Sequence, residues 1–476
     1  MASTLDFTTF HNVIDGKLEN TTEKRTTTNL SSLETNPEVP LSSQVDVDRA
    51  IQAAQKASKQ WAAVPWSERK KALEDFTAEF ESLSEEFSKA LVWEHGKPLL
   101  WARNEIGTAL KFLKGYATLS PLPEETIEDS AERKITTHYV PVGIAVGIVP
   151  WNYPIYLASA KIGPALLTGN AFILKASPFT PYTSLKMAEL AQKFFPPGVF
   201  QALSGDDSLG PMLTSHPDVN MVSFTGSILT GKAIMKSCSG TLKRVVLELG
   251  GNDPAIVCAD ADPVSAAMRI GLFAFCNSGQ LCMSIKRIYV HEFIYDQFLG
   301  ALVQHAGALG VGVGETDFLG PIATEPHFKR VETLLSGIKE AGYTVVAGGT
   351  ERLADKKGFY IPATIIDNPP EDSAIVKEEQ FAPVIPVMKW SEESDVIQRA
   401  NGTDAGLGAS VWTRDDEQAT RIASQLQAGN VWINTHAEIE PNTPFSGHKQ
   451  SGLGVEHSVA GLKAYCNVRS VFRKPF

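Results

Sequence analysis

Cysteine is scarce in this sequence, and long apolar runs are missing. The 476 residues include five cysteines, which form no CxxC pair and no Cys/His spacing of a metal site. Disulfide-rich secreted domains and zinc modules are therefore excluded, and a reducing compartment is expected. No window approaches about 18 uninterrupted apolar residues, so no transmembrane helix is expected.

Targeting signals are also missing from the two ends of the sequence. The first residues contain neither a basic segment leading into an apolar run nor early arginines, which argues against a signal or transit peptide. The last three residues, Lys474, Pro475 and Phe476, are not a peroxisomal signal. Cytoplasm is therefore the expected location.

Runs of like charge are absent as well. The net charge of −11 comes from 54 acidic and 43 basic residues spread along the chain, a pattern that disfavours nucleic acid as a partner. With 43% hydrophobic and 20% charged residues, the composition is that of a globular protein that is neither disordered nor embedded in a membrane. The length predicts two or three domains.

Periodicity predicts alternating helices and strands along most of the chain. Residues 1–45 are rich in Thr, Asn and Ser and predict short strands and loops. Helices are expected from about residue 46, then after Pro65 with residues 69–83, and over about 87–95. Buried strands are expected over 143–149, 170–175, 198–203, 221–224 and 243–247.

What the sequence does contain is a cysteine behind a polar run. Cys282 follows Asn277, Ser278, Gly279 and Gln280, whose backbone N–H groups can approach the sulfur. A free thiol has a pKa of about 8.5, so a nucleophilic one needs an electropositive, partly exposed setting or a nearby base. The alternative is a small buried hydrophobe, which is a common role for free cysteine.

The position of Glu248 favours the interpretation of Cys282 as a nucleophile over that of a small buried hydrophobe. Glu248 stands between an apolar strand and Gly250-Gly251, so a strand would deliver one carboxylate into a loop that the backbone can approach closely. Glu248-Leu249-Gly250-Gly251 and Gly279-Gln280-Leu281-Cys282 together resemble the signature pair of the aldehyde dehydrogenase superfamily, and the resemblance extends over nearly the whole chain.

The resemblance implies an α/β fold with three parts. These are a doubly wound cofactor-binding domain, an α/β catalytic domain and a small β oligomerisation arm. The expected boundaries are 1–123 with 142–248 for the cofactor-binding domain, 249–445 for the catalytic domain, and 124–141 with 456–476 for the arm.

The resemblance also implies oxidation of an aldehyde to the carboxylic acid with NAD or NADP and without a metal. Cys282 would attack the carbonyl, Asn152 would meet the oxyanion, and Glu248 would activate the water that hydrolyses the thioester. Two alternatives remain open. One is an enzyme that transfers the acyl group to coenzyme A, which Glu248 disfavours, and the other is a non-catalytic structural or binding protein.

Matches to the family's cofactor site follow the predicted strands. Lys175 matches a lysine that binds the adenosine ribose, and Pro178 stands where NAD-preferring members carry Glu, so both NAD and NADP are expected. Asp207 replaces a usual Gly in the loop after Gly205. The expected cofactor residues are Trp151, Lys175, Pro178, Gly205, Gly226, Ser227, Leu249, Glu379 and Phe381.

A third group of matches surrounds the expected aldehyde tunnel. These side chains are mostly apolar, and a small Ala160 stands where many relatives carry a bulky aromatic residue, so a roomy pocket is expected. None of them is an Arg that could bind a carboxylate substrate. The group is Tyr153, Leu157, Ala160, Leu281, Met283, His436 and Ile439.

Residues 124–141 alternate between polar and apolar side chains, which predicts a hairpin standing off the body. In the family, such an arm pairs with a partner subunit, so a homodimer or homotetramer is expected. The alternative is a hairpin that stays exposed.

Overall fold

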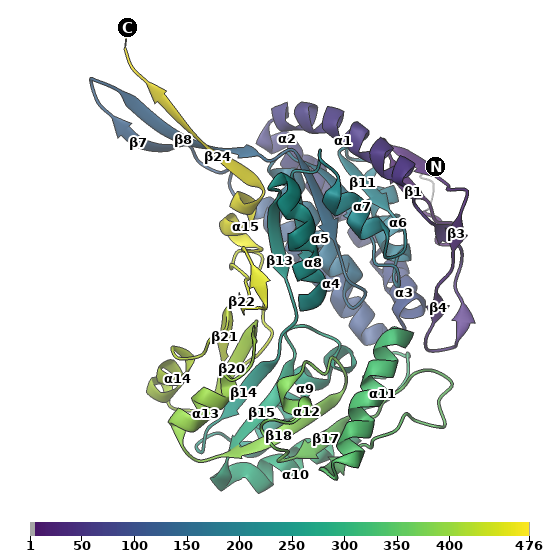
Figure 1. The fold of residues 1–476 in the computed structure, drawn as a ribbon, viewed down its shortest axis with the longest axis vertical. Helices are drawn as coiled ribbons and strands as arrows, with labels where there is room; N and C mark the ends of the chain where they lie inside the picture. Colours follow the sequence, from purple (N-terminus) through teal and green to yellow (C-terminus); the bar gives the residue numbers. More distant parts are fainter. Residues whose placement is uncertain (1–4, 476) are drawn as a thin grey trace.

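The computed structural model describes residues 5–475. Two open sheets, each covered by helices on both faces, form the body of the molecule (Figure 1). The first sheet has the order β2 (Lys17–Glu19), β1 (Asn12–Ile14), β11 (Phe200–Leu203), β10 (Ala171–Lys175), β9 (Ile144–Ile148), β12 (Met221–Thr225), β13 (Arg244–Glu248) and β23 (Gly452–Leu453).

The five central strands of this sheet, β11 to β13, run parallel, whereas β1 and β23 pair antiparallel at its ends. Strands β9, β10 and β12 are buried along their whole length because helices cover both faces of the sheet. One apolar core lies under α1 (Gln44–Ala63), α7 (Leu209–Ser215) and α8 (Ile228–Cys238). The opposite core lies under α2 (Trp66–Ser82), α3 (Ser84–His95), α4 (Leu99–Thr118), α5 (Pro154–Leu167) and α6 (Tyr182–Ala191).

The second sheet is also mostly parallel. Its order is β16 (Thr344–Ala347), β17 (Thr364–Asp367), β18 (Val384–Trp390), β15 (Ile285–His291), β14 (Asp253–Val257), β20 (Gly408–Trp412) and β21 (Asn430–Ile433), with only the β16–β17 pair antiparallel. Helices α9 (Pro263–Phe275) and α10 (Tyr295–Gly307) cover one face. Helices α11 (Glu325–Glu340), α12 (Ala374–Lys377), α13 (Glu393–Ala400) and α14 (Asp416–Ala423) cover the other.

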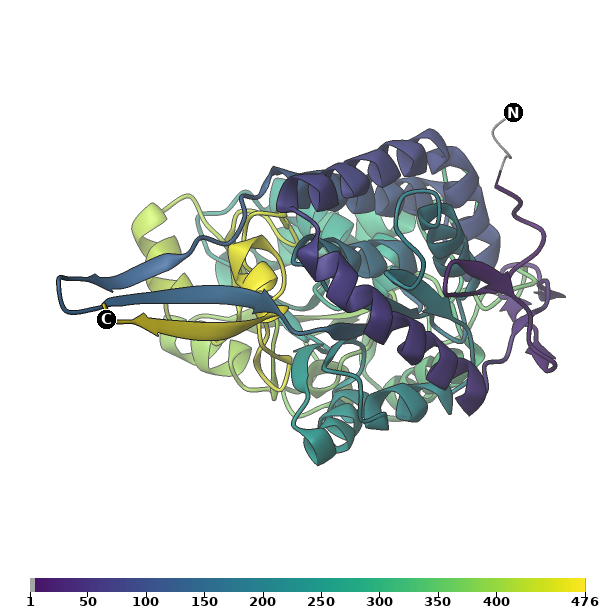
Figure 2. The same cartoon turned by 90° about the horizontal axis from the view of Figure 1, so that it is seen from above.

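A three-stranded antiparallel arm projects from this body (Figures 1 and 2). It has the order β24 (Cys466–Arg473), β8 (Lys134–Pro141) and β7 (Glu125–Asp129), so the chain's last strand lies against the predicted hairpin. The register runs from Cys466 opposite Pro141 to Arg473 opposite Lys134. Helix α15 (Ser458–Ala464) leads into β24.

The remaining strands are short. They are β3 (Lys24–Arg25), β4 (Thr28–Asn29), β5 (Glu34–Thr35), β6 (Val39–Pro40), β19 (Ala405–Gly406) and β22 (His448–Lys449). Within residues 5–475, no helix combines the length and the apolarity needed to cross a membrane.

Candidate active site

Strand β9 lies between β10 and β12, at the point where the order of the first sheet reverses. Ligands of doubly wound sheets bind at the carboxyl ends of strands at such a switch point. A cavity of about 370 Å³ lies there. It is lined by residues at or beyond the carboxyl ends of β9, β10 and β12 and by residues of the second half of the chain: Pro150, Trp151, Asn152, Phe179, Thr225, Gly226, Ser227, Gly250, Cys282, Thr324, Pro326, His327, Arg330, Glu379 and Phe381.

An unusual turn presents Cys282 to this cavity. Asn277, Ser278 and Gly279 have φ angles of 47°, 58° and 69°, which place three consecutive residues in the left-handed region. This conformation costs roughly 1–2 kcal/mol for each residue other than Gly, so the surroundings must hold it. The Ser278 hydroxyl does so by donating to the Gly320 carbonyl at 2.9 Å.

Gln280 anchors the same turn on its other side. Its Nε2 donates to the carbonyls of Asn277 and Pro321, each at 3.2 Å, and its Oε1 accepts from the Ala323 N–H at 2.8 Å. Gly279 is confined by the opposite loop, because a Cβ there would lie 2.3 Å from the carbonyl oxygen of Ala382. The sequence before the sulfur is thus held by two neighbouring loops.

The Cys282 thiol is half-buried at the cavity wall. Burial is the largest influence on its pKa and raises it to about 12. The positive charge of Lys286 acts in the opposite direction, while the carboxyls of Glu379, Asp253 and Glu248 raise the pKa further. The resting group is therefore a thiol, and forming the thiolate depends on the nearby charges.

Asn152 lies beside this turn and is buried. Its side-chain Nδ2 donates to the Gln280 carbonyl at 3.1 Å, which leaves a second amide N–H for another acceptor. The backbone of Asn152 is held by a buried ion pair, because Lys97 Nζ lies 2.7 Å from its carbonyl oxygen and 2.5 Å from Glu105.

Glu105 extends this support by accepting the Ile155 N–H at 2.8 Å. Lys97 belongs to Gly96-Lys97-Pro98, which predicts only the end of a helix when it is considered as sequence. Its contribution to the site was therefore missed.

Glu248 ends strand β13 and is 4% exposed. Neither of its carboxyl oxygens has a hydrogen-bond partner among the described residues. Burial raises its pKa well above the ordinary value, the charge of Glu456 raises it further, and Lys161 acts in the opposite direction. The group is thus a strong base once it is deprotonated.

Lys161 and Glu456 are buried charged residues that the sequence analysis missed. Lys161 Nζ lies 2.5 Å from Glu456 Oε1, and Glu456 also accepts from the Ser223 hydroxyl at 3.2 Å. A signal for Lys161 was available, because it stands in an otherwise apolar helix whose residues are all buried.

The residues around the cavity fit a dinucleotide cofactor. Gly226 and Ser227 precede α8, and the N-terminus of a helix favours a phosphate. At the other side, the Glu379 carboxylate is positioned by the Gly251 N–H at 3.2 Å and can accept from ribose hydroxyls. Trp151 and Phe381 meet edge to face, with ring centroids 5.5 Å apart, and offer apolar surface to a flat ring.

Four of the expected cofactor residues do not line this cavity: Lys175, Pro178, Gly205 and Leu249. Lys175 ends strand β10, and burial lowers its pKa to about 8. Leu249 packs under α8, where a Cβ on Gly231 would lie 2.6 Å from its side chain.

Arg25 is a further cation near this group. Its guanidinium donates to the Gly205 carbonyl at 3.4 Å, and it interacts with the charges of Asp206 and Asp207. It comes from β3, one of the short strands predicted for residues 1–45, but nothing in the sequence indicated its place beside the cofactor region.

A second cavity of about 490 Å³ adjoins Tyr153 and the Cys282 segment. Four of the expected substrate residues line it: Tyr153, Leu281, Met283 and Ile439. The others that line it are Trp101, Asn104, Thr108, Lys111, Tyr156, Leu272, Phe273, Cys276, Ala437, Glu438 and Glu440.

Leu157, Ala160 and His436 are buried but are not among these lining residues. Ala160 faces Tyr116, whose hydroxyl donates to its carbonyl at 3.2 Å. The His436 ring contacts the Met283 carbonyl at 3.0 Å. The small Ala160 side chain, which stands where many relatives carry a bulky aromatic residue, therefore does not widen this cavity directly.

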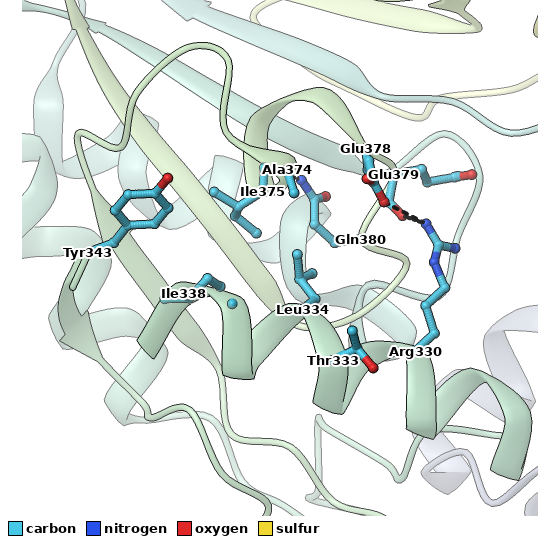
Figure 3. Close-up of a pocket in the computed structure, with 11 residues that line it drawn as sticks. Arg330, Thr333, Leu334, Ile338, Tyr343, Ala374, Ile375, Glu378, Glu379 and Gln380 are labelled. Carbon is cyan, nitrogen blue, oxygen red and sulfur yellow. Dashed lines mark hydrogen bonds and ion pairs between the residues drawn. The ribbon is translucent and has the colours of Figure 1, made fainter. Parts of the chain in front are cut away.

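A third cavity, of about 330 Å³, lies between α11 and the segment 374–380 (Figure 3). It shares Arg330 and Glu379 with the first cavity. Arg330 donates to the Glu379 carbonyl at 2.7 Å and lies 3.9 Å from the Glu378 carboxylate. Arg330 thus supports the backbone of Glu379 from outside.

Comparisons with known proteins find one family, and the match covers nearly the whole length of this chain. The profile of the aldehyde dehydrogenase family matches residues 18–471. Aldehyde dehydrogenase LUC3 of Fusarium sp is 40% identical over 98% of this chain and 99% of its own.

Two solved structures superpose equally well. An NAD-dependent aldehyde dehydrogenase from Sinorhizobium meliloti has a TM-score of 0.95 and 31% identity, covering 98% of this chain and 94% of its own. An NADP-dependent enzyme from E. coli has a TM-score of 0.95 and 32% identity, covering 98% of this chain and 99% of its own.

Proposed function

The chain belongs to the aldehyde dehydrogenase family and oxidises aldehydes to carboxylic acids with NAD or NADP, and we propose that Cys282, Asn152 and Glu248 carry this reaction. For Cys282 and Asn152, the supporting observation is the left-handed turn at 277–279 and the cavity that both residues line. For Glu248, it is the buried carboxyl at the end of β13, which has no hydrogen-bond partner among the described residues.

The first step is addition of the Cys282 thiolate to the aldehyde carbon. A C–S bond forms, and the carbonyl π electrons move to oxygen to give the thiohemiacetal anion. The free N–H of the Asn152 amide and the backbone N–H of Cys282 donate to this oxyanion. Donors of this kind are worth about 3–4 kcal/mol each.

Glu379 and Phe381 would hold the nicotinamide half of a bound NAD or NADP, which would supply a hydride acceptor for that carbon, and Cys282 would then carry a thioester. Glu248 then takes a proton from a water molecule as its oxygen attacks the thioester. The C–S bond breaks, its electron pair returns to the sulfur of Cys282, and the carboxylic acid is released. Burial, and after it the charge of Glu456, raise the pKa of Glu248, which strengthens this base.

The cofactor residues are proposed to divide along the dinucleotide. Glu379 would bind the nicotinamide ribose and Phe381 would pack by the ring, while the N-terminus of α8 would bind the pyrophosphate. Lys175 and Pro178 would face the adenosine ribose. The lack of a carboxylate at Pro178 supports use of both NAD and NADP.

The substrate is proposed to be a bulky, uncharged aldehyde, aromatic or long and aliphatic. The 490 Å³ cavity presents Trp101, Tyr153 and Phe273, whose rings favour apolar groups. Lys111 also lines it, but it is paired with Glu440 at 2.6 Å and would have to leave this partner to bind a carboxylate.

A panel of substrates tests this choice. We expect kcat/KM to be higher for aromatic and long aliphatic aldehydes than for a semialdehyde that carries a carboxylate. A preference for the semialdehyde would contradict the proposal. Added coenzyme A should leave the free acid as product, and formation of a thioester of coenzyme A would support the acylating alternative.

The nucleophile can be identified directly. Protein mixed with aldehyde and cofactor, then quenched in acid, should carry the acyl group on the peptide with Cys282 when examined by mass spectrometry. Cys282→Ala should lose turnover yet still bind cofactor, whereas Cys238→Ala, which removes a buried thiol outside the cavity, should keep turnover. Acylation of Cys276 instead would contradict the assignment.

The assembly and division of the chain are part of the same proposal. The projecting arm of β7, β8 and β24 supports a homodimer or homotetramer, with the domain boundaries expected from the sequence. The five free cysteines support a reducing compartment, the cytoplasm.

A further inference from the structure

Lys286 is a buried lysine on β15, four residues after Cys282, and its side chain turns back to the loop before it. Its Nζ donates to the carbonyls of Leu281 and Cys282 at 2.7 and 2.9 Å and to the Ser284 hydroxyl at 3.0 Å. One ammonium group therefore holds the main chain on both sides of the nucleophile.

The same ammonium faces the cofactor side of the site. Lys286 Nζ lies 3.7 Å from Glu379 Oε1 and 5.7 Å from the centre of the Phe381 ring. The distance to Glu379 is that of an ion pair without a close hydrogen bond. A buried cation is costly unless neighbouring groups compensate it, and here carbonyl dipoles of the Cys282 turn do so.

We propose that Lys286 is a positioning residue that fixes the Cys282 turn, supplies positive charge to the sulfur and links the nucleophile to Glu379. This inference rests on the proposed role of Cys282. It goes further because a ligand bound at the nucleotide site would influence the Cys282 thiolate through Lys286.

The charges around the sulfur support this link. The charged groups that influence the Cys282 thiol are Lys286, which is positive, and the carboxyls Glu379, Asp253 and Glu248. Without Lys286, only the three carboxyls of this set would act on the thiol, and all three raise its pKa. A ligand that bonds to Glu379 competes with Lys286 for this carboxylate, which frees more of the lysine's charge for the sulfur.

Alkylation of the thiolate tests the proposal without turnover. The cofactor-free protein is treated with iodoacetamide across a range of pH, and the modified Cys282 peptide is quantified by mass spectrometry. In Lys286→Met, we expect the pH at which the alkylation rate is half-maximal, called the midpoint below, to rise by at least about one unit. Lys286→Arg keeps the charge and should give a smaller rise.

A matched control is Lys243→Met. Lys243 is also a buried lysine beside a cysteine, Cys238, but it lies just before strand β13 of the first sheet and outside the cavity. Its replacement should leave the Cys282 midpoint unchanged. An equal rise in this control would show a general effect of lost stability and would overturn the specific role of Lys286.

The link to the cofactor is tested from the other side. NAD added to the parent should lower the Cys282 midpoint, and Lys286→Met should abolish this change although NAD binding, followed by tryptophan fluorescence, is retained. Glu379→Gln should lower the midpoint without cofactor, and this measurement does not depend on folding of Lys286→Met. Midpoints that stay at the parent value in Glu379→Gln and in any folded Lys286 variant would overturn the proposal.

Failure of the proposed function has a different signature. If Cys282 is not the nucleophile, Cys282→Ala retains turnover, whatever the alkylation profiles of the parent and the Lys286 variants. If Cys282 is the nucleophile but Lys286 has no role, Cys282→Ala is inactive and the pH midpoint of Cys282 alkylation in Lys286→Met equals that of the parent.

Discussion

The chemistry of the site depends on a few charged side chains that burial makes sensitive to their neighbours. Glu248 has no hydrogen-bond partner in the described structure, and its pKa is raised by burial and by Glu456. A raised carboxyl pKa means that the base form is reached only as the pH rises through that value. Deacylation should therefore increase with pH on a limb well above the ordinary carboxyl pKa of about 4.3.

Replacing Glu248 by Gln separates the two half-reactions. The variant should release one equivalent of reduced cofactor in a burst and then stall as the thioester, because the base for hydrolysis is missing. Rapid-mixing absorbance measures the burst, and the steady-state rate should lose the alkaline-rising limb of the parent. Unchanged steady-state turnover would show that another group activates the water.

The preference between NAD and NADP also depends on a few single residues. Pro178 offers no carboxylate to ribose hydroxyls and no repulsion to a 2′-phosphate, and Lys175 and Arg25 are cations in the same region. A carboxylate about 4 Å from a phosphate costs roughly 1–4 kcal/mol in a partly solvated site. Pro178→Glu should therefore lower the NADP/NAD ratio of kcat/KM at least about fivefold.

Asp207→Asn is the matched variant for this experiment. It removes a negative charge that acts on both Lys175 and Arg25, so it should move the ratio toward NADP. A parent that already rejects NADP would contradict the expectation, as would a ratio that Pro178→Glu leaves unmoved.

The sequence predicted these residues unevenly. Cys282, Asn152 and Glu379 could be named because each belongs to a local motif, and the structure brings them to one cavity. Lys286 and Lys97 could not be assigned, because their partners are main-chain carbonyls whose positions exist only after folding.

At the level of elements, the five central strands of the first sheet, β9 to β13, were predicted well, and helix starts less closely. A strand buried on both faces is a continuous apolar run, as in β9 and β10, and needs no knowledge of its neighbours. The helix expected near residue 46 begins at Gln44, because Ser43 caps it and Asp46 completes a capping box. The second helix begins at Trp66, directly after Pro65 as expected, and the third begins at Ser84, before the expected start near Phe87.

The turn at 277–279 makes a prediction at this scale. Gly279 and Gly342 both have a φ of +69°, but only Gly279 is crowded, because a Cβ there would lie 2.3 Å from the Ala382 carbonyl oxygen whereas one at Gly342 would meet open space. Alanine at either position should cost roughly 1–2 kcal/mol for the left-handed backbone. Gly279→Ala should cost more, and it should lower kcat/KM because the backbone leading to Cys282 must shift.

Urea unfolding midpoints and steady-state kinetics measure both effects. Gly342→Ala is the control and should keep the parent's kcat/KM. Equal losses of stability and activity in the two variants would show that contact with Ala382 does not restrict the turn.

At the level of the whole molecule, the projecting arm has an edge strand whose outer side is left unpaired within the described part of a single chain. Strand β24 is an edge strand of eight residues, and beyond Cys466 its residues are exposed, including Val468 at 63% and Phe472 at 68%. A long edge strand with exposed apolar side chains invites pairing with another chain. The alternation at 124–141 predicted the hairpin and the resemblance assigned 456–476 to the same arm, but the register of β24 on β8 could be learned only from the fold.

The last prediction follows from this edge. Deleting residues 464–476 removes β24 and should shift the protein toward smaller species in sedimentation velocity at micromolar concentration. The double variant Val468→Glu, Phe472→Glu should do the same, because two buried carboxylates would oppose an apolar contact between arms. Phe293→Glu is the control, since Phe293 is 80% exposed but lies outside the arm, and it should leave the particle size unchanged. A parent that sediments as a monomer would contradict the proposed interface, as would a double variant that keeps the size of the parent.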